Sequence, residues 1–275
     1  MEKIYIKLDE KGKIKAKIAD MLKNCLDAEI LLLKKVKKEY PDKYNLFIKS
    51  IFSDIKELIK FNKLINSEVI NLVSYEYLKD KPELFKRSVS TALKFLNFSK
   101  YEDQPLEEEI EVDMIDFVKL YDFFEYYLAN SLLSIMSGEE LIDFYKKFND
   151  EVTISRRDPK NYYESLEEVM KFFDRIIRAN QNQDVIMCLE EKGKFILKVE
   201  RCKWAEVLKD LNPEISYAML CYADFERAKN YNPNFTLTRT KTIMQGNDFC
   251  DFCYHDTRVH KEIKHPAPDY WKNLD

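Results

Sequence analysis

Residues 184–202 have the sequence DVIMCLEEKGKFILKVERC, and this stretch decides the fold class. Two runs, 184–190 and 195–202, alternate in the manner of β-strands, and the Glu-Lys-Gly-Lys sequence between them is typical of a tight turn. The pattern therefore predicts an antiparallel β-hairpin.

The segments on either side of this hairpin extend the prediction. A helix is expected before it, and after it come a short helix, a second helix that begins with Asn at the N-cap and Pro at N1, and then a second pair of strands. In chain order these are 162–180, 204–211, 213–228, 236–244 and 249–255. The order strand, strand, helix, helix, strand, strand predicts an antiparallel sheet with helices packed on one side, an α+β domain.

The first half of the chain has a different pattern. It is highly charged, only four glycines occur in the 275 residues, and apolar residues recur at three- and four-residue spacing. Helices are expected from 18 until Pro41 stops the first of them, and over 44–61, 67–79, 82–95, 114–136 and 139–148. The sequence thus predicts a helical region over 1–155 and an α+β domain over 156–275, which ends in a loose surface segment at 265–268.

Charge and composition exclude several classes of protein. The chain has 45 Lys and Arg against 49 Asp and Glu, and its lysines alternate with acids, so no nucleic-acid-binding surface is expected. Apolar runs are too short to span a bilayer, and the charged N-terminus does not suit a signal peptide. We expect a cytoplasmic protein that does not bind membranes and whose six cysteines are reduced. The sequence does not indicate an oligomeric state.

Cysteines concentrate near the second pair of strands. If the turn lies at Gly246, Ile243 pairs with Cys250, and Cys250 shares a face with Arg239 and Lys241. Two cations beside a thiol predict a lowered pKa, as a nucleophilic cysteine requires. The alternative is that Cys250 is simply a small buried apolar residue. Because residues three apart on a strand point to opposite faces, Cys250 and Cys253 are not expected to form a redox or zinc C-x-x-C pair.

Two further interpretations concern the helix before these strands. Asp224 lies at the edge of its apolar stripe and can face Arg239 and Cys250, either as an active-site acid or as a helix-to-strand ion pair. No cofactor is expected. A zinc ion held by Cys202, Cys221 and Cys250 is the minority possibility, because the spacings match no common zinc motif.

A longer pattern spans this region: Cys221-x-x-Asp224, Asn232-Pro233, Arg239-Thr-x-Thr242 and Gly246-x-x-x-Cys250-Asp-Phe252. It resembles the C-terminal pattern of the L-2-amino-thiazoline-4-carboxylic acid hydrolase family, best over Glu200–Tyr254. The resemblance implies hydrolytic opening of a small cyclic amidine to a product like N-carbamoyl-cysteine. One departure is Cys253, which follows the Cys-Asp-Phe triplet.

The resemblance also implies roles for particular residues. Arg239 would bind the substrate carboxylate, and Cys250 would be the nucleophile, or would line the pocket while Asp224 activates water. Cys221, Gly246, Asp248 and Asp251 would complete the substrate site, although Asp251 lies on the wrong face of the strand for a regular hairpin. The competing hypothesis is a non-catalytic domain of the same fold that binds a small molecule or a metal as a thiol sensor.

Overall fold

The computed structural model describes residues 3–53, 55 and 80–274. They divide into two compact units: Met1–Gly12 with Phe144–Asp275, here called the sheet unit, and Lys13–Asp143, the helical unit. This division differs from the expected boundary at residue 155, because the first twelve residues and residues 144–155 group with the C-terminal part of the chain.

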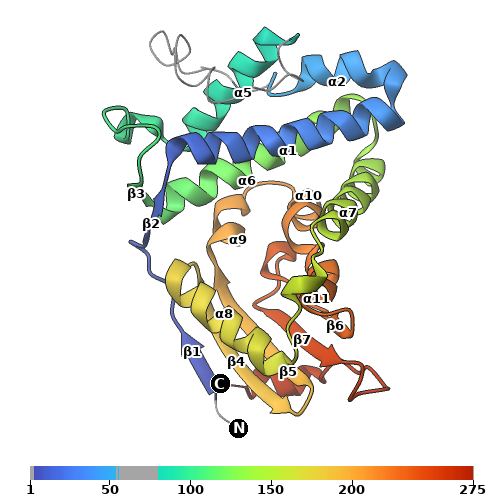
Figure 1. The fold of residues 1–275 in the computed structure, drawn as a ribbon. Coiled ribbons are helices and arrows are strands. Elements are labelled where there is room, and N and C mark those ends of the chain that lie inside the picture. The colour runs from blue at the N-terminus through green and yellow to red at the C-terminus, as the bar shows by residue number, and fades with distance from the viewer. Residues whose placement is uncertain (1–2, 54, 56–79, 275) are drawn as a thin grey trace. The chain divides into compact units, whose positions relative to one another are not determined.

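The sheet unit is built on a five-stranded antiparallel sheet with the order β1-β4-β5-β7-β6 (Figure 1). The strands are β1 (Lys3–Ile6), β4 (Gln183–Glu191), β5 (Lys194–Cys202), β6 (Phe235–Thr238) and β7 (Cys250–Asp256). The predicted hairpin is present as β4 and β5, whose turn contains Gly193 at φ 78°. The α+β class is confirmed.

In the sheet unit, helices precede, separate and follow the strands along the chain. The sheet unit contains α8 (Leu166–Asn180), α9 (Lys203–Leu208), α10 (Pro213–Ser216), the π-helical turn η5 (Tyr217–Cys221), α11 (Asp224–Tyr231) and α12 (Pro268–Lys272), with the short turns η4 (Pro159–Asn161) and η6 (Ile243–Gln245). Asn212 caps α10 as predicted, because its side-chain oxygen accepts from the backbone N–H groups of Glu214 and Ile215.

The two faces of the sheet carry separate apolar cores. On one face, residues such as Phe195 and Leu197 pack with Val169 and Ile177 of α8, which lies across the sheet in Figure 1. On the other face, Ile196 and its neighbours pack with residues of the C-terminal segment. The prediction that helices cover one side only is therefore wrong. The strands are apolar on both faces, as expected of a sheet buried between two layers.

The C-terminal segment provides the second of these layers. Trp271 of α12 is 1% exposed and packs with Cys188 and Cys253, while the ring of His265 stacks on its indole. The backbone oxygen of Leu274 accepts a 2.5 Å hydrogen bond from Lys3 of β1. The expectation of a loose tail is wrong. The two prolines suggested an exposed segment, but the chain continues into α12, where Trp271 is buried.

The second strand pair differs from its predicted register. Leu237 faces Tyr254 and Thr238 faces Cys253, two residues away from the expected pairing, and β6 ends at Thr238. The carboxylate of Asp251 accepts from the backbone N–H groups of Thr240 and Lys241 at 2.8 and 2.6 Å, so these amides are not available to continue the ladder. A shift of two residues keeps each side chain on its expected face, but only as far as the strand continues.

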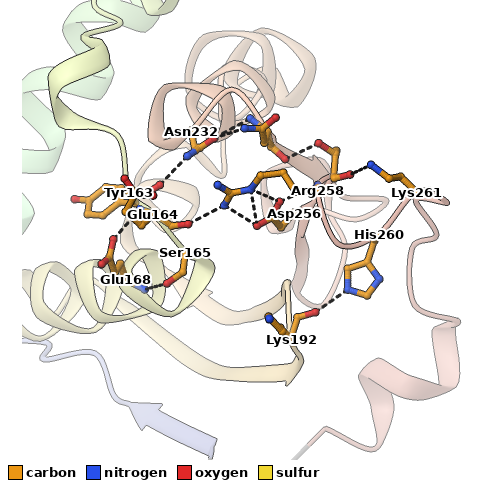
Figure 2. A network of polar contacts seen from close by, with 12 residues as sticks. Tyr163, Glu164, Ser165, Glu168, Lys192, Asn232, Asp256, Arg258, His260 and Lys261 are labelled. Carbon is orange, nitrogen blue, oxygen red and sulfur yellow. Dashed lines mark hydrogen bonds and ion pairs between the residues drawn. The ribbon is translucent and has the colours of Figure 1, made fainter.

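Polar contacts fix α8 against the end of the sheet (Figure 2). Arg258 donates to the backbone oxygen of Glu164 at 2.7 Å, and Asn232 donates to that of Tyr163 at 2.8 Å. The side chain of Ser165 caps the helix that follows. These bonds hold the start of α8 beside β6 and β7, and α8 forms one wall of the cavity described below.

The helical unit contains α1 (Ile18–Glu39), η1 (Pro41–Lys43), α2 (Tyr44–Ser50), α5 (Pro82–Phe95), η2 (Phe98–Lys100), α6 (Met114–Asn130) and η3 (Ser131–Ser134), with a two-stranded pairing of β2 (Lys13–Ala16) and β3 (Ile110–Asp113). Helix α7 (Gly138–Ser155) is longer than predicted and crosses the division between the units.

The N-terminal part of the chain agrees with the sequence predictions at some elements and differs at others. The helix at 82–95 is confirmed, but the first residues form strands β1 and β2 where charged helix was expected. Of the second predicted helix, 44–61, the structure shows α2 ending at Ser50, and residues 54 and 56–61 lie outside the described part of the chain. The helix predicted at 67–79 lies outside the described residues. Within the described part of the chain, no helix combines the length and apolar character needed to cross a bilayer.

Candidate functional site

A cavity of about 390 Å³ lies within the sheet unit, between α8, the sheet and the segments from α9 to η6. Its walls are mostly aliphatic and aromatic, with a few polar groups from α8, β4 and α11. The lining residues are Phe173, Ile176, Ile177, Asn180, Asn182, Gln183, Leu197, Val199, Cys202, Trp204, Ala205, Leu220, Cys221, Asp224, Arg227, Tyr231, Ile243, Met244, Cys250, Phe252 and Tyr254. An apolar pocket of this size with few polar groups is the usual form of a small-molecule site.

Asp224 is the one carboxylate among the described residues that line this cavity. It occupies the first turn of α11 and binds two guanidinium groups, one through each oxygen. Arg239 donates to Oδ2 at 2.7 Å, and Arg227, one helical turn further along α11, donates to Oδ1 at 2.9 Å. The carboxylate is therefore held in a fixed orientation with 21% of its side chain exposed.

Arg239 is buried, with only 1% of its side chain exposed. Its second amino group donates to the backbone oxygen of Cys221 at 2.8 Å, and its guanidinium lies over the rings of Phe225 and Phe252. Burial alone would lower the pKa of Arg239, but the negative charge of Asp224 outweighs it and raises that pKa. The helix-to-strand ion pair anticipated from sequence is thus present.

Arg239 is not among the residues that line the cavity. The arrangement gives it a supporting position behind Asp224, where both of its amino groups already have protein acceptors. The acceptor of the second bond, the Cys221 oxygen, is at the last residue of the π-helical turn η5. Arg227, whose side chain is 49% exposed, is the cation on the cavity wall.

Three thiols line the cavity, those of Cys202, Cys221 and Cys250. Cys250 is 8% exposed, and its sulfur accepts a 3.2 Å hydrogen bond from the backbone N–H of Ile243. Burial raises the pKa of Cys250 to about 12, although the Ile243 amide and Arg239 oppose this effect. The expectation of a lowered pKa is therefore wrong, and the thiol is protonated at neutral pH.

The second cation expected beside Cys250 lies elsewhere. The amino group of Lys241 is 4.9 Å from the ring centroid of Phe249, a residue that packs on the opposite core. The end of β6 at Thr238 explains the difference, because strand alternation no longer applies at Lys241. Cys253 also belongs to the opposite core, so the prediction that Cys250 and Cys253 diverge is confirmed.

Ligands for a metal are not assembled in this region. Cys202, Cys221 and Cys250 share the cavity, but the described part of the chain contains no group of three or more Cys, His, Asp or Glu side chains placed to hold an ion. No cysteine among the described residues is joined in a disulfide. The thiols are therefore lining groups in this structure.

The other predicted substrate-binding residues do not reach the cavity. Gly246 ends the turn η6 at φ 84°, a conformation that favours glycine, and nothing lies within 4 Å of where a Cβ would be. Asp248 is exposed in the same loop. Asp251 is buried and braces that loop through the amides of Thr240 and Lys241. These residues shape the loop that brings Ile243 and Cys250 to the cavity.

A polar chain on the opposite face of the sheet was missed from sequence. The hydroxyl of Thr238 lies 3.0 Å from Nε2 of His255 and 3.0 Å from Nδ1 of His265, whose Nε2 lies 3.0 Å from Asp251. Burial lowers the pKa of His255 to about 4, with help from the positive charge of Lys194. The chain links the C-terminal segment to the loop after β6, and His255 lies away from Cys250 as predicted.

The polar groups on the cavity wall were not predicted from the sequence either. Asn180, Asn182 and Gln183 come from the junction of α8 and β4, a segment without a recognisable motif. Arg227 had a usable signal, because it lies three residues after Asp224 on the same helix and must share its face.

The comparisons with known proteins agree with this location. Residues 130–254 match the model of the family described as L-2-amino-thiazoline-4-carboxylic acid hydrolase, which confirms the resemblance noted from the sequence. The match includes every residue that lines the cavity. The chain matches no curated protein and no solved structure.

Proposed function

We propose that the sheet unit is a hydrolase that opens a cyclic amidine of the thiazoline-carboxylate type. The family match supports the reaction class. The observation that carries the proposal is the position of Asp224, a carboxylate oriented by two guanidinium groups on the wall of an otherwise apolar cavity. Such a site offers a base, a cation for the substrate carboxylate and a region from which water is largely excluded.

The reaction needs one water molecule and no redox partner. Asp224 takes a proton from water, whose oxygen adds to the carbon between the ring nitrogen and the ring sulfur. The carbon–sulfur bond then breaks, the sulfur leaves with the proton that Asp224 had accepted, and the second proton of the water passes from the new hydroxyl to the former ring nitrogen, which gives the carbamoyl group. The product is an N-carbamoyl-cysteine-like thiol, so atoms and charge balance.

Arg227 provides the anion-binding group in this scheme, in place of Arg239. Its guanidinium lies on the cavity wall and reaches Asp224 at 2.9 Å. A substrate carboxylate bound to Arg227 is thereby placed beside Asp224.

Cys250 is assigned to the cavity wall and not to nucleophilic attack. Burial raises its thiol pKa to about 12, so the reactive thiolate is scarce at neutral pH. Among the two mechanisms that the sequence left open, this favours water activated by Asp224.

The test is release of a new thiol from 2-amino-thiazoline-4-carboxylate, followed with a thiol reagent at a substrate excess large enough to exceed the six cysteines of the protein. Asp224→Asn is expected to lower the rate by about 100-fold or more, as loss of a positioned base does. Cys250→Ser is expected to keep the rate within about fivefold, because serine retains the size of the side chain but not its nucleophilicity.

Three outcomes separate the alternatives. Loss of activity in Cys250→Ser with a normal melting temperature would make the thiol the nucleophile. Unchanged turnover in Asp224→Asn would remove the proposed base. Binding of the compound without thiol release in the wild type would favour the thiol-sensor alternative, for which three thiols on one cavity are the supporting observation.

A further inference from the structure

The cavity is large for the compound that names the matched family, which has one five-membered ring with an amino group and a carboxylate. We infer that the natural ligand is a cyclic amidine whose ring bears an apolar substituent. This inference rests on the proposed function for the reacting ring only, since the substituent is deduced from the cavity itself.

The first observation is volume. The cavity measures about 390 Å³, within the range of about 300–1,000 Å³ that is usual for sites of drug-sized ligands. At roughly 30 Å³ for each liquid water molecule, this is room for about a dozen waters. A single substituted five-membered ring fills only a fraction of that space.

The second observation is the chemistry of the walls. Phe173 and Ile176 from α8 stand opposite the sheet, which contributes Leu197 and Phe252. Protein groups of this kind give ordered water few hydrogen-bond partners, so a large part of the cavity favours hydrocarbon over water. The arrangement therefore suits an apolar group better than a hydrated void.

The third observation is where the charges lie. Asp224 and Arg227 are both on α11, one turn apart, and are bonded to each other. A carboxylate and an amidine carbon that engage this pair occupy one part of the cavity. The remaining lining groups, among them the apolar side chains of Leu197 and Ala205, are available to whatever else the ring carries.

The probes are two series of 2-amino-thiazoline-4-carboxylates, one extended on the exocyclic nitrogen and one on ring carbon 5, each with methyl to butyl chains. Binding is measured by calorimetry with the full chain. Burial of one methylene in an apolar site is expected to strengthen binding about fourfold. A progressive gain in at least one series supports the inference, whereas constant or falling affinity in both overturns it.

A cavity-filling variant tests whether the gain comes from this cavity. Ala205 of α9 is 8% exposed and lines the cavity, so Ala205→Phe places a ring in the space that the alkyl chain would occupy. We expect the loss of affinity for the butyl compound to be at least tenfold greater than the loss for the unsubstituted one. The matched control is Ala179→Phe, the same change at an exposed position of α8, which should alter neither.

Separate measurements of binding and of thiol release, together with Ala205→Phe, distinguish a failure of this inference from a failure of the proposed function. Tight binding of alkyl compounds without thiol release supports the apolar ligand and contradicts the hydrolase. Rapid hydrolysis of the unsubstituted compound with no gain from alkyl chains supports the hydrolase and contradicts the apolar ligand. If Ala205→Phe fails to fold, a second variant at the sheet wall, Leu197→Ala, is expected to weaken binding of the butyl compound more than that of the unsubstituted one, and equal effects count against the inference.

Discussion

At the scale of single residues, the two arginines on Asp224 differ in what surrounds them. Arg239 is 1% exposed and is held by Asp224, the Cys221 oxygen and the ring of Phe252, while Arg227 is 49% exposed on the cavity wall. A buried charge without a partner destabilises the fold, whereas an exposed ion pair contributes little to stability. The two side chains should therefore separate stability from ligand binding.

Replacement of the buried cation tests the first half of this statement. Arg239→Gln removes the buried ion pair with Asp224, while Arg227 still pairs with that carboxylate, and is expected to lower the free energy of unfolding by about 1.5–3 kcal/mol. Arg227→Gln is the matched control and should change that free energy by less than about 1 kcal/mol while weakening substrate binding. Urea denaturation and KM measure the two effects, and equal stability losses in both variants would contradict the assignment.

Part of this arrangement was predictable from sequence. Strand alternation over 250–255 correctly sends Cys250 and Cys253 to opposite faces, because it depends only on consecutive residues of one strand. The cation beside Cys250 was not predictable in the same way. Whether Lys241 lies beside Cys250 depends on where β6 ends. The hydrogen bonds from the Thr240 and Lys241 amides to Asp251 determine that end.

At the scale of elements, the loop between β6 and β7 is the feature that forms the site. Asp251 accepts from the amides of Thr240 and Lys241 and from the hydroxyl of Thr240, and its Oδ2 lies 3.0 Å from His265. Burial alone would raise the pKa of Asp251, but these hydrogen bonds outweigh it and lower that pKa. The carboxylate thus stabilises the loop in its ionised form.

Asp251→Asn is expected to destabilise the protein by about 1–3 kcal/mol at pH 7, because an amide cannot accept all of these bonds. The pKa of Asp251 is lower in the folded protein than in the unfolded chain, so its contribution is complete above the unfolded value of about 3.8 and is lost as pH falls further. Urea midpoints of variant and wild type should therefore converge below about pH 3.8. Asp248→Asn, an exposed change in the same loop, is the control and should stay within about 0.5 kcal/mol.

At the scale of the whole molecule, the division into units does not follow the order of the chain, because Met1–Gly12 belongs to the same unit as Phe144–Asp275. Residues of β1 pair with β4, with Lys3 opposite Cys188, so the first strand joins a sheet formed by residues far along the chain. Local patterns predicted the β4–β5 hairpin and the helix at 82–95, because those depend on neighbouring residues. A strand of four residues with a single charge, Lys3–Ile6, carries too little pattern to show its distant partner.

The two units also hold different probes of unfolding. Both tryptophans, Trp204 and Trp271, lie in the sheet unit, whereas Glu29 is fully buried in the helical unit and accepts a hydrogen bond from Ser88 at 3.0 Å. Burial raises the pKa of Glu29 to about 8, so the folded helical unit holds this carboxyl in its protonated form. Tryptophan fluorescence therefore reports on the sheet unit, whereas circular dichroism reports on the helices of both units.

The raised pKa fixes the direction of the pH effect on the helical unit. In the unfolded chain Glu29 ionises near pH 4.5, so the stability of this unit should fall as pH rises from about 4.5 to about 8, by up to about 5 kcal/mol. Glu29→Gln should remove most of that dependence in circular dichroism and leave the fluorescence transition unchanged. Glu83→Gln, at an exposed position of the same unit, should leave both as in the wild type. If fluorescence and circular dichroism shift together with pH, the units unfold as one, because a change confined to Glu29 then moves the tryptophans of the other unit as well.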